Sequence, residues 1–339
     1  MNNNQKSYQL IGIGNSIMDY FCHVSDDFLI KNSLVKGSMA LIDKSQMTNL
    51  NQLSIEKFSS GGSVANTINN ISQLEKNSDN FPIAFIGSIG SDLAGQQFMN
   101  DLKNNNIDYI GQINKNLDTA SSFIFITPDG QRTMCTYLGC SPNIELKNIN
   151  LDYLANCKIL YIEGYLWDNP TTIETIKTII SLAKKQQCKI AFSLSDSFCV
   201  ERNHQEFLEL ISRDIDILFA NELEINKLCQ ISQFNSEIIN NFIAKLNQNI
   251  ILATTLSDKG CQIFFDKSYI SIPTLQKKPI DTTGAGDSFA SGFLYGLIKG
   301  LEINKCGEIG NIFAGKIIEK IGARFSLQET INLKDTLKL

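Results

Sequence analysis

The nine residues Asp281–Phe289 (Asp-Thr-Thr-Gly-Ala-Gly-Asp-Ser-Phe) combine two carboxylates with a glycine-rich turn. Apolar residues then recur at the spacing of one helical face, at Phe289, Phe293 and Leu297. This spacing predicts a helix that begins within the stretch and ends near Gly300. The glycines would therefore lie at a helix N-terminus, where unpaired backbone N–H groups and the positive end of the helix dipole favour an anion.

Asp287 would stand on the first turn of this helix, beside the anion. Because Gly284 and Gly286 have no Cβ, the backbone can approach a phosphate closely there. A carboxylate in that place can accept the proton of an attacking hydroxyl. This arrangement suits phosphoryl transfer, in which positioning and electrostatics do most of the work. The plain alternative is an N-capping Asp after a glycine turn.

The complete stretch resembles the C-terminal signature of the ribokinase-like (PfkB) carbohydrate and nucleoside kinases. The resemblance extends over about residues 8–325 and implies an α/β fold, with a central, mostly parallel sheet, helices on both faces and a small β lid. It also implies that Asp287 is the catalytic base and that Gly284, Ala285 and Gly286 form an anion hole. The implied ligands are ATP and Mg²⁺, with K⁺ as a further expectation by analogy.

Two glycine-containing segments near the N-terminus carry polar residues that could contact a sugar. Asn15 and Asp19 are four residues apart, just past a predicted strand at 8–14, and could hydrogen-bond vicinal hydroxyls. The alternative is a turn Asn and a surface Asp. Gly61 and Gly62 precede a helical run, for which a structural turn is the plain alternative. The family resemblance implies that these four residues and Asn66 contact the substrate.

Extended segments outside the βα alternation predict the lid. We expect one domain spanning 1–339, with the lid formed by inserted β segments at about 17–58 and 118–140. The first segment is predicted to contain short extended pieces and turns. The second contains two strands joined by a Pro-Asp-Gly hairpin turn. Arg132 lies just past this turn and could reach the transferring phosphoryl group; the alternative is an exposed strand arginine.

From residue 151 onward, predicted strands and helices alternate. Such alternation indicates a parallel sheet with helices on both faces, right-handed crossovers and ligands at the carboxyl ends of the strands. The predicted strands are 158–165, 189–195, 216–220 and 249–255, and the predicted helices are 172–187, 203–211, 236–247 and 306–321. Asn15, Asn221, Thr255 and Asp287 all follow a predicted strand or begin a helix, so they are expected at one edge of the sheet.

Two further groups are expected to hold metal ions. Asn221 and Glu224 have the spacing of a capping box, which is a structural interpretation. The family resemblance assigns Asn-x-x-Glu at this place to Mg²⁺ and its waters, and a single Glu acting through water is compatible with Mg²⁺ chemistry. Asp281 and Thr283 are expected to help hold a monovalent cation, by analogy alone.

The nucleotide is expected to contact two later segments. The family resemblance places the phosphate loop at 254–260, where Thr255 and Gly260 match and Ser257 replaces the usual first glycine. The Cβ and hydroxyl of Ser257 predict a less close approach to the phosphates. Asn311 and Ala314 are expected to line the adenine pocket.

Composition limits the remaining classes. The net charge of −5 and the lack of a basic block argue against a nucleic-acid partner. There is no apolar run of transmembrane length and no apolar signal core, so a cytoplasmic protein without membrane contact is expected. Nine scattered cysteines without a CxxC and only two histidines argue against zinc. A monomer and a homodimer both remain open.

The expected substrate is a small molecule with a ribose-like group. Segments 36–39, 127–139 and 161–165 most resemble the adenosine-kinase branch, which favours adenosine phosphorylated at its 5′-OH. The alternatives are a sugar kinase acting on ribose, fructose or a related sugar, another nucleoside kinase acting on inosine or guanosine, and a non-catalytic sensor, against which the intact glycine turn and Asp287 argue. An aromatic wall would favour a nucleoside, and the candidates are Phe21, Phe123, Phe125 and Tyr137.

Overall fold

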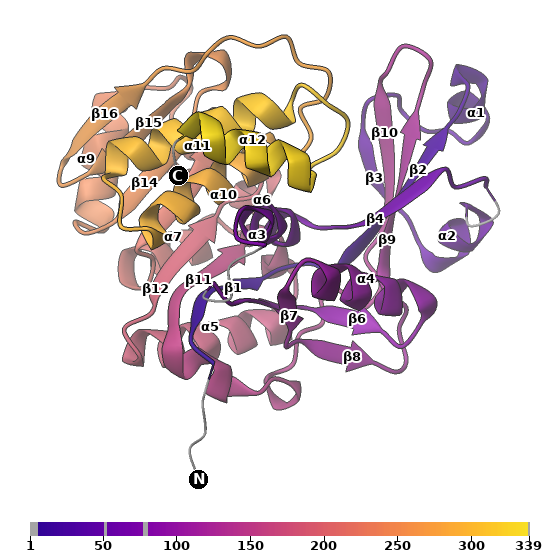
Figure 1. The fold of residues 1–339 in the computed structure, drawn as a ribbon, viewed down its shortest axis with the longest axis horizontal. Helices are drawn as coiled ribbons and strands as arrows, with labels where there is room; N and C mark the ends of the chain where they lie inside the picture. The colour runs from indigo at the N-terminus through magenta and orange to yellow at the C-terminus, as the bar shows by residue number, and fades with distance from the viewer. Residues whose placement is uncertain (1–5, 51–52, 77–80, 338–339) are drawn as a thin grey trace.

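A nine-stranded sheet forms the centre of the fold in the computed structural model, which describes residues 6–50, 53–76 and 81–337 (Figure 1). Its strand order is β16-β15-β14-β13-β12-β11-β1-β5-β7. All neighbouring strands are parallel except at β14–β15 and β15–β16. The strands are β1 (Tyr8–Ile13), β5 (Ile83–Ile86), β7 (Ile107–Tyr109), β11 (Cys157–Glu163), β12 (Lys189–Ser193), β13 (Ile217–Asn221), β14 (Ile251–Thr255), β15 (Cys261–Phe265) and β16 (Ser268–Ile272).

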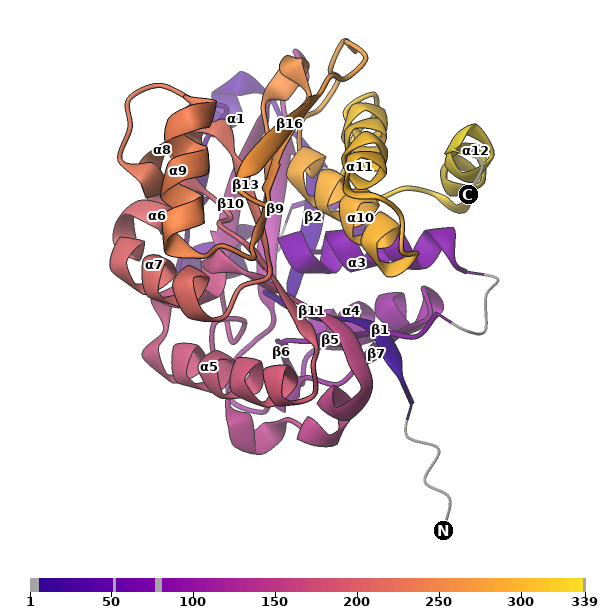
Figure 2. The same cartoon turned by 90° about the vertical axis from the view of Figure 1, so that its left-hand side faces the viewer.

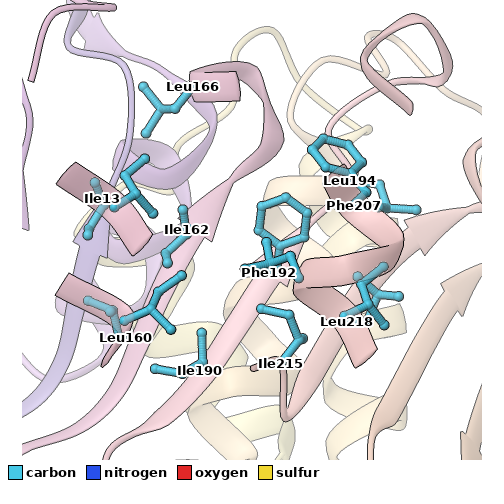
Figure 3. Packing of buried hydrophobic residues seen from close by; sticks show 14 of the residues in the cluster. Ile13, Leu160, Ile162, Leu166, Ile190, Phe192, Leu194, Phe207, Ile215 and Leu218 are labelled. Atoms are coloured by element: carbon cyan, nitrogen blue, oxygen red, sulfur yellow. The ribbon is translucent and has the colours of Figure 1, made fainter. Parts of the chain in front are cut away.

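The central strands are apolar at consecutive positions because both faces of the sheet are covered. On β11, Leu160 and Ile162 pack into one core cluster, whereas Ile159 and Tyr161 pack into a second cluster on the opposite face. Figure 3 shows the first cluster, in which Leu160 and Ile162 lie with Ile190, Phe192 and Phe207. The predicted α/β fold with a large, mostly parallel sheet is confirmed.

Helices cover both faces of the sheet (Figure 2). One face carries α5 (Pro170–Lys185), α6 (Ser197–Arg202), α7 (His204–Arg213), α8 (Glu222–Cys229) and α9 (Ser236–Leu246). The other face carries α3 (Ser63–Leu74), α4 (Leu93–Asn104), α10 (Ala285–Ile298), α11 (Ile303–Ile317) and α12 (Leu327–Leu337). Short 3₁₀ helices lie at Leu146–Asn148, Leu151–Asn156, Gly164–Asp168 and Ser257–Lys259. Among the described residues, no helix combines the length and apolar character needed to cross a membrane.

A second, mixed sheet stands beside the main body (Figure 1). We call it the lid sheet; its order is β3-β10-β9-β2-β4. The strands are β2 (Ile17–His23), β3 (Met39–Leu41), β4 (Lys57–Gly61), β9 (Ala120–Ile126) and β10 (Arg132–Tyr137). β9 and β10 pair antiparallel, as the hairpin turn predicts, while β2 pairs parallel with β9. A separate two-stranded ladder joins β6 (Ser88–Gly90) to β8 (Gln112–Asn114).

The prediction of short extended pieces and turns in the first lid segment is met by β2, β3 and β4 but omits two helices. Two short helices occur there, α1 (Asp26–Lys31) and α2 (Lys44–Leu50). The side chain of Ser25 caps α1 by accepting a hydrogen bond from the backbone of Phe28. Each helix buries one apolar side chain, Leu29 or Met47, in the core of the lid sheet. This tertiary burial decides the conformation of helices that are too short to be stable alone.

Candidate active site

Three elements bring polar side chains together at the carboxyl edge of the large sheet. Asn15 follows β1, Glu163 ends β11, and Asp287 stands in the first turn of α10. The backbone N–H of Asn15 donates to Glu163 Oε1 at 2.8 Å, so the ends of β1 and β11 are linked directly. This edge is where an α/β sheet with this topology binds ligands.

The carboxylate of Asp287 is held by two side chains from the start of α3. Ser63 Oγ donates to Oδ1 at 2.6 Å, and Asn66 Nδ2 donates to Oδ2 at 3.0 Å. Burial raises the pKa of Asp287 to about 6, although these two bonds and the charge of Arg324 oppose the rise. A half-buried carboxylate with such a pKa can accept a proton near neutral pH.

The glycine turn before α10 is open toward the same space. Gly284 is the N-cap of α10 with φ of 75°, and its carbonyl accepts from Ser288 N at 2.8 Å. Gly286 has no heavy atom within 4 Å of the place where a Cβ would stand. Its N–H belongs to the first turn and has no partner within the helix. The Ala285 N–H donates to the carbonyl of Thr282 at 3.2 Å, so among the three expected anion-hole residues it is already engaged in the turn.

The two glycines at the end of β4 allow close packing around Asp19 and Asn15. A Cβ at Gly61 would overlap the Asp19 carboxylate, and a Cβ at Gly62, whose φ is 99°, would overlap the backbone oxygen of Asn15. Burial raises the pKa of Asp19 to about 7, and the charges of Arg324 and Arg132 oppose this rise. The Asp19 carboxylate therefore depends on nearby arginines to stay ionised.

Glu163 is a site residue that the sequence motifs missed. It is 0% exposed, and its oxygens accept three N–H bonds, from Asn15 N at 2.8 Å, Asn15 Nδ2 at 2.7 Å and Val64 N at 3.0 Å. Burial nevertheless raises its pKa to about 7. Ser141 Oγ donates to Asn15 Oδ1 at 2.9 Å, so most of the Asn15 amide is engaged within the protein. The one signal in the sequence was an acidic residue at the end of an otherwise apolar strand.

Arg132 reaches from the lid sheet to the glycine turn. Its Nη1 lies 2.6 Å from Asp281 Oδ2 and donates to Thr283 Oγ1 at 3.3 Å. The guanidinium also lies over the ring of Phe21, with 5.9 Å between Cζ and the ring centroid. Both residues that were expected to hold a monovalent cation are therefore contacted by Arg132.

Arg324 was also missed. It lies between α11 and α12, and its guanidinium contacts Asn66, Ser60 and Asp101. Its sequence neighbours carry no motif that would have singled it out. These contacts place it one side chain away from Asp287, through Asn66.

Asn221 and Glu224 form the capping box at the start of α8. Glu224 N donates to Asn221 Oδ1 at 2.9 Å, and Asn221 N and Nδ2 donate back to the Glu224 carboxylate at 3.0 Å and 2.5 Å. Burial raises the pKa of Glu224 to about 7, and the charge of Asp196 adds to this effect. The predicted capping box is thus formed. The Glu224 carboxylate still has lone pairs that could accept hydrogen bonds from metal-bound water.

The residues expected to contact the nucleotide lie around β14–β16 and α11. Thr255 ends β14, and Ser257 adopts φ of 55°, a conformation that favours glycine. Gly260, with φ of 92°, closes this turn. Asn311 Nδ2 donates to the carbonyls of Ile272 at 3.0 Å and Pro273 at 3.3 Å. Asn311 lines a cavity of about 520 Å³ between the loop after β16, α11 and α12.

Two of the four candidates for an aromatic wall are fully buried. Phe123 and Phe125 are 0% exposed in the core of the lid sheet, where they pack with Tyr20 and Phe28. Tyr137 packs against the same core. Strand alternation directs these side chains inward, and only Phe21 contacts a site residue, Arg132.

The comparisons with known proteins agree on one family. Residues 32–330 match the model of the pfkB family of carbohydrate kinases. The solved structure of a probable sugar kinase protein from Rhizobium etli CFN 42 is 35% identical, covers 98% of this chain and 99% of its own, and superposes with a TM-score of 0.85. Adenosine kinase from Sinorhizobium meliloti is 32% identical, covers 96% of this chain and 99% of its own, and has a TM-score of 0.84. An uncharacterised sugar kinase from Archaeoglobus fulgidus is 27% identical over 251 residues, which are 74% of this chain and 96% of that protein.

Proposed function

The chain belongs to the pfkB family of carbohydrate kinases, ATP-dependent enzymes with an alcohol group as acceptor, and we propose that its acceptor is the 5′-hydroxyl of adenosine. In this proposal the acceptor oxygen forms a bond to the γ-phosphorus of ATP, the bond from that phosphorus to the β–γ bridging oxygen breaks, and ADP and AMP are the products. The hydroxyl proton passes to Asp287 Oδ.

The observation that carries the proposal is the placement of Asp287. Its carboxylate is oriented by Ser63 and Asn66 beside the open glycine turn, and its pKa of about 6 leaves it mostly ionised at pH 7. A proton acceptor and backbone N–H donors are thus adjacent at one helix N-terminus. We propose that Gly284, Ala285 and Gly286 stabilise the charge on the transferring group, with the Ala285 N–H turning from Thr282 to the substrate.

We propose that the ribose lies between the lid sheet and α3. Asp19 is a carboxylate acceptor for vicinal hydroxyls, and Asn66 contributes its amide beside Asp287. Gly61 and Gly62 let the backbone approach the sugar. One N–H of the Asn15 amide donates to Glu163, and the other can donate to a sugar hydroxyl. In this proposal Arg132 moves away from Asp281 and Thr283 and contacts the transferring phosphoryl group. Asp281 and Thr283 are then free to hold K⁺.

The residues that would hold ATP and Mg²⁺ have side chains and backbone groups suited to phosphates, a base and a metal ion. Thr255, Ser257 and Gly260 form a turn for the phosphates, and the cavity beside Asn311 has room for a base. The carboxylate of Glu224 and the amide of Asn221 are oxygen donors of the kind that Mg²⁺ prefers, acting through water. When bound, Mg²⁺ neutralises charge on the phosphates.

A free sugar is the second candidate substrate. The burial of Phe123 and Phe125 leaves Phe21 as the candidate that lies beside Arg132, so fewer of the four aromatic candidates can stack on a base. The similarity to both a probable sugar kinase and an adenosine kinase at comparable identity supports keeping both candidates, with inosine and guanosine as further nucleosides.

The test is ATP consumption with adenosine, inosine, guanosine, ribose and fructose, using Asp287→Asn as the control. Turnover of adenosine that falls by at least about 10²-fold in Asp287→Asn is the expected result. Turnover of a sugar alone, with the same loss in Asp287→Asn, would retain the base and overturn adenosine. Unchanged turnover in Asp287→Asn would overturn the assigned base.

A further inference from the structure

Arg324 joins three segments that meet behind the catalytic carboxylate. Its Nη1 donates to Ser60 Oγ at 2.5 Å on β4 and to Asp101 Oδ2 at 2.6 Å on α4. Its Nε donates to Asn66 Oδ1 at 3.0 Å on α3. The side chain is only 15% exposed, so these contacts are largely shielded from water.

The contact with Asn66 sets the orientation of the Asn66 amide. A guanidinium has donors and no acceptors, so only the carbonyl oxygen of Asn66 can face Arg324. The NH₂ group must then point the opposite way, where it donates to Asp287 Oδ2 at 3.0 Å. Rotating the amide by 180° would set its NH₂ against the guanidinium and its oxygen against the carboxylate, which breaks both hydrogen bonds.

We propose that Arg324 is a positioning residue for phosphoryl transfer, which acts through Asn66 to orient and keep ionised the Asp287 carboxylate. This inference rests on the proposed role of Asp287 as proton acceptor. It assigns Arg324 no contact with the substrate, and it makes a residue of the loop before α12 part of the catalytic machinery.

Charge supports the same conclusion. The carboxylates that face Arg324 are Asp19 on β2, Asp101 on α4 and Asp287 on α10, and the Arg324 charge lowers the pKa of both Asp19 and Asp287. Asp287 also interacts electrostatically with Tyr161, Glu163 and Tyr165. Arg324 is the cation that offsets this acidic surrounding at Asp287 itself.

A purely structural role would look different. Arg324 also ties the end of β4 to α4, so its loss could simply loosen the fold. Loosening would lower the amount of active enzyme without moving the pH dependence of the remaining activity. A pH profile and a double-mutant cycle with Asn66 therefore distinguish the two roles.

The experiment measures kcat and kcat/KM from pH 5 to pH 9, with the acceptor from the substrate panel that gives the highest turnover. The variants are Arg324→Gln, Arg324→Lys, Asn66→Ala and the double variant Arg324→Gln/Asn66→Ala. Arg202→Gln, which breaks an exposed ion pair with Asp168, is the matched control, and Asp287→Asn tests the base. Thermal unfolding of every variant reports on folding.

We expect Arg324→Gln to lower kcat about tenfold or more and to move the acid limb of kcat/KM upward by about one pH unit. Arg324→Lys keeps the charge but loses the Nε donor. The acid limb of its kcat/KM profile should therefore move less than that of Arg324→Gln, while its kcat still falls. At pH 9, where the Asp287 carboxylate is ionised in every variant, the kcat of the double variant should be no lower than that of Asn66→Ala alone, because both changes remove one relay. Arg324→Lys provides the test if Arg324→Gln does not fold.

The inference is overturned if the losses in the double variant multiply and the acid limb of each Arg324 variant coincides with that of the wild type. It is also overturned if Arg324→Lys folds and retains full kcat. Activity retained by Asp287→Asn would instead overturn the assigned base, so failure of the proposed function and failure of this inference are distinguishable.

Discussion

The guanidinium of Arg132, on β10 of the lid sheet, lies 2.6 Å from the carboxylate of Asp281, at the start of the glycine turn. The two side chains are only 10% and 6% exposed. Asp281 also accepts backbone N–H bonds from Thr283 at 3.0 Å and Gly322 at 2.9 Å. The lid sheet and the anion-binding turn are therefore joined by one shielded ion pair. The two backbone hydrogen bonds would hold Asp281 in the turn even without this pair.

Breaking this pair should destabilise the protein. Arg132→Met leaves the Asp281 carboxylate without its cation, and we expect the free energy of unfolding to fall by about 3 kcal/mol. Asp281→Asn combined with Arg132→Met should cost less than the sum of the two single changes, since both remove the same contact. Urea unfolding of the four proteins gives the coupling energy. Lys36→Met, at the more exposed pairs with Asp26 and Asp129, should cost much less, because water screens these charges; equal losses at both sites would contradict the prediction.

The activity should depend on the ionisation of Asp287. Because its pKa is about 6 and the carboxylate form accepts the proton, kcat/KM should fall as the pH drops through 6, about tenfold per pH unit below it. The measurement is a pH–rate profile at low substrate concentration. An acid limb centred near pH 4, the ordinary range of an aspartate, would contradict it.

Glu163 should make stability depend on pH in the opposite sense to a surface carboxylate. Its pKa is raised from 4.5 to about 7 in the folded protein, so its contribution to stability is present below pH 4.5 and is lost as the pH rises through 7. Glu163→Gln removes this group, so the decline in unfolding free energy from pH 5 to pH 7 should become shallower by on the order of 2 kcal/mol. The variant should also lose stability at every pH, because either Val64 N or the Asn15 donors would face an NH₂ group.

Urea unfolding at pH 5, 6 and 7 measures this slope. Glu201→Gln, at an exposed ion pair with Lys227, is the control and should keep the wild-type slope. A wild-type slope in Glu163→Gln would show that Glu163 stays ionised throughout.

Glu224→Gln should separate the capping role from the metal role. Glutamine at this position can accept from Asn221 N but sets its NH₂ against Asn221 Nδ2, so the melting temperature should fall by a few degrees while the helix cap is kept. The loss of the carboxylate should raise the Mg²⁺ concentration needed for half-maximal activity by about 10- to 100-fold. A Mg²⁺ titration of activity beside a thermal melt measures both. An unchanged Mg²⁺ requirement would leave Glu224 with the capping role alone.

Ser257→Gly should strengthen ATP binding by the loop that holds Ser257. Ser257 has φ of 55°, which costs a residue with a Cβ about 1 kcal/mol, while glycine gains a similar amount of entropy in the unfolded chain. The melting temperature should therefore change by only a few degrees. The KM for ATP should fall, because the backbone can approach the phosphates without a Cβ. Initial rates against ATP concentration give the KM, and an unchanged or higher value would contradict the expectation.

Local sequence was sufficient to predict the elements whose signals are contiguous. Asp281–Phe289 predicted a helix N-terminus with a carboxylate on its first turn, and α10 begins at Ala285 with Asp287 in that turn. The capping box at Asn221 and the hairpin between β9 and β10 were also read from neighbouring residues. Such features depend on hydrogen bonds within a few residues, so their pattern is visible in the chain itself.

The contacts that complete the site join residues that are far apart in the sequence. Asn15 and Glu163 are 148 positions apart, and Asn66 and Arg324 are 258 positions apart. The position of Glu163 at the end of an apolar strand does not indicate how far its pKa is raised, and no motif near Arg324 indicates the amide orientation that it imposes on Asn66. The inward facing of Phe123 and Phe125 and the helices α1 and α2 likewise follow from packing within the lid sheet. The burial of Glu163 and the direction of the hydrogen bond between Asn66 and Arg324 arise only when distant elements pack together. Only the tertiary structure therefore decides them.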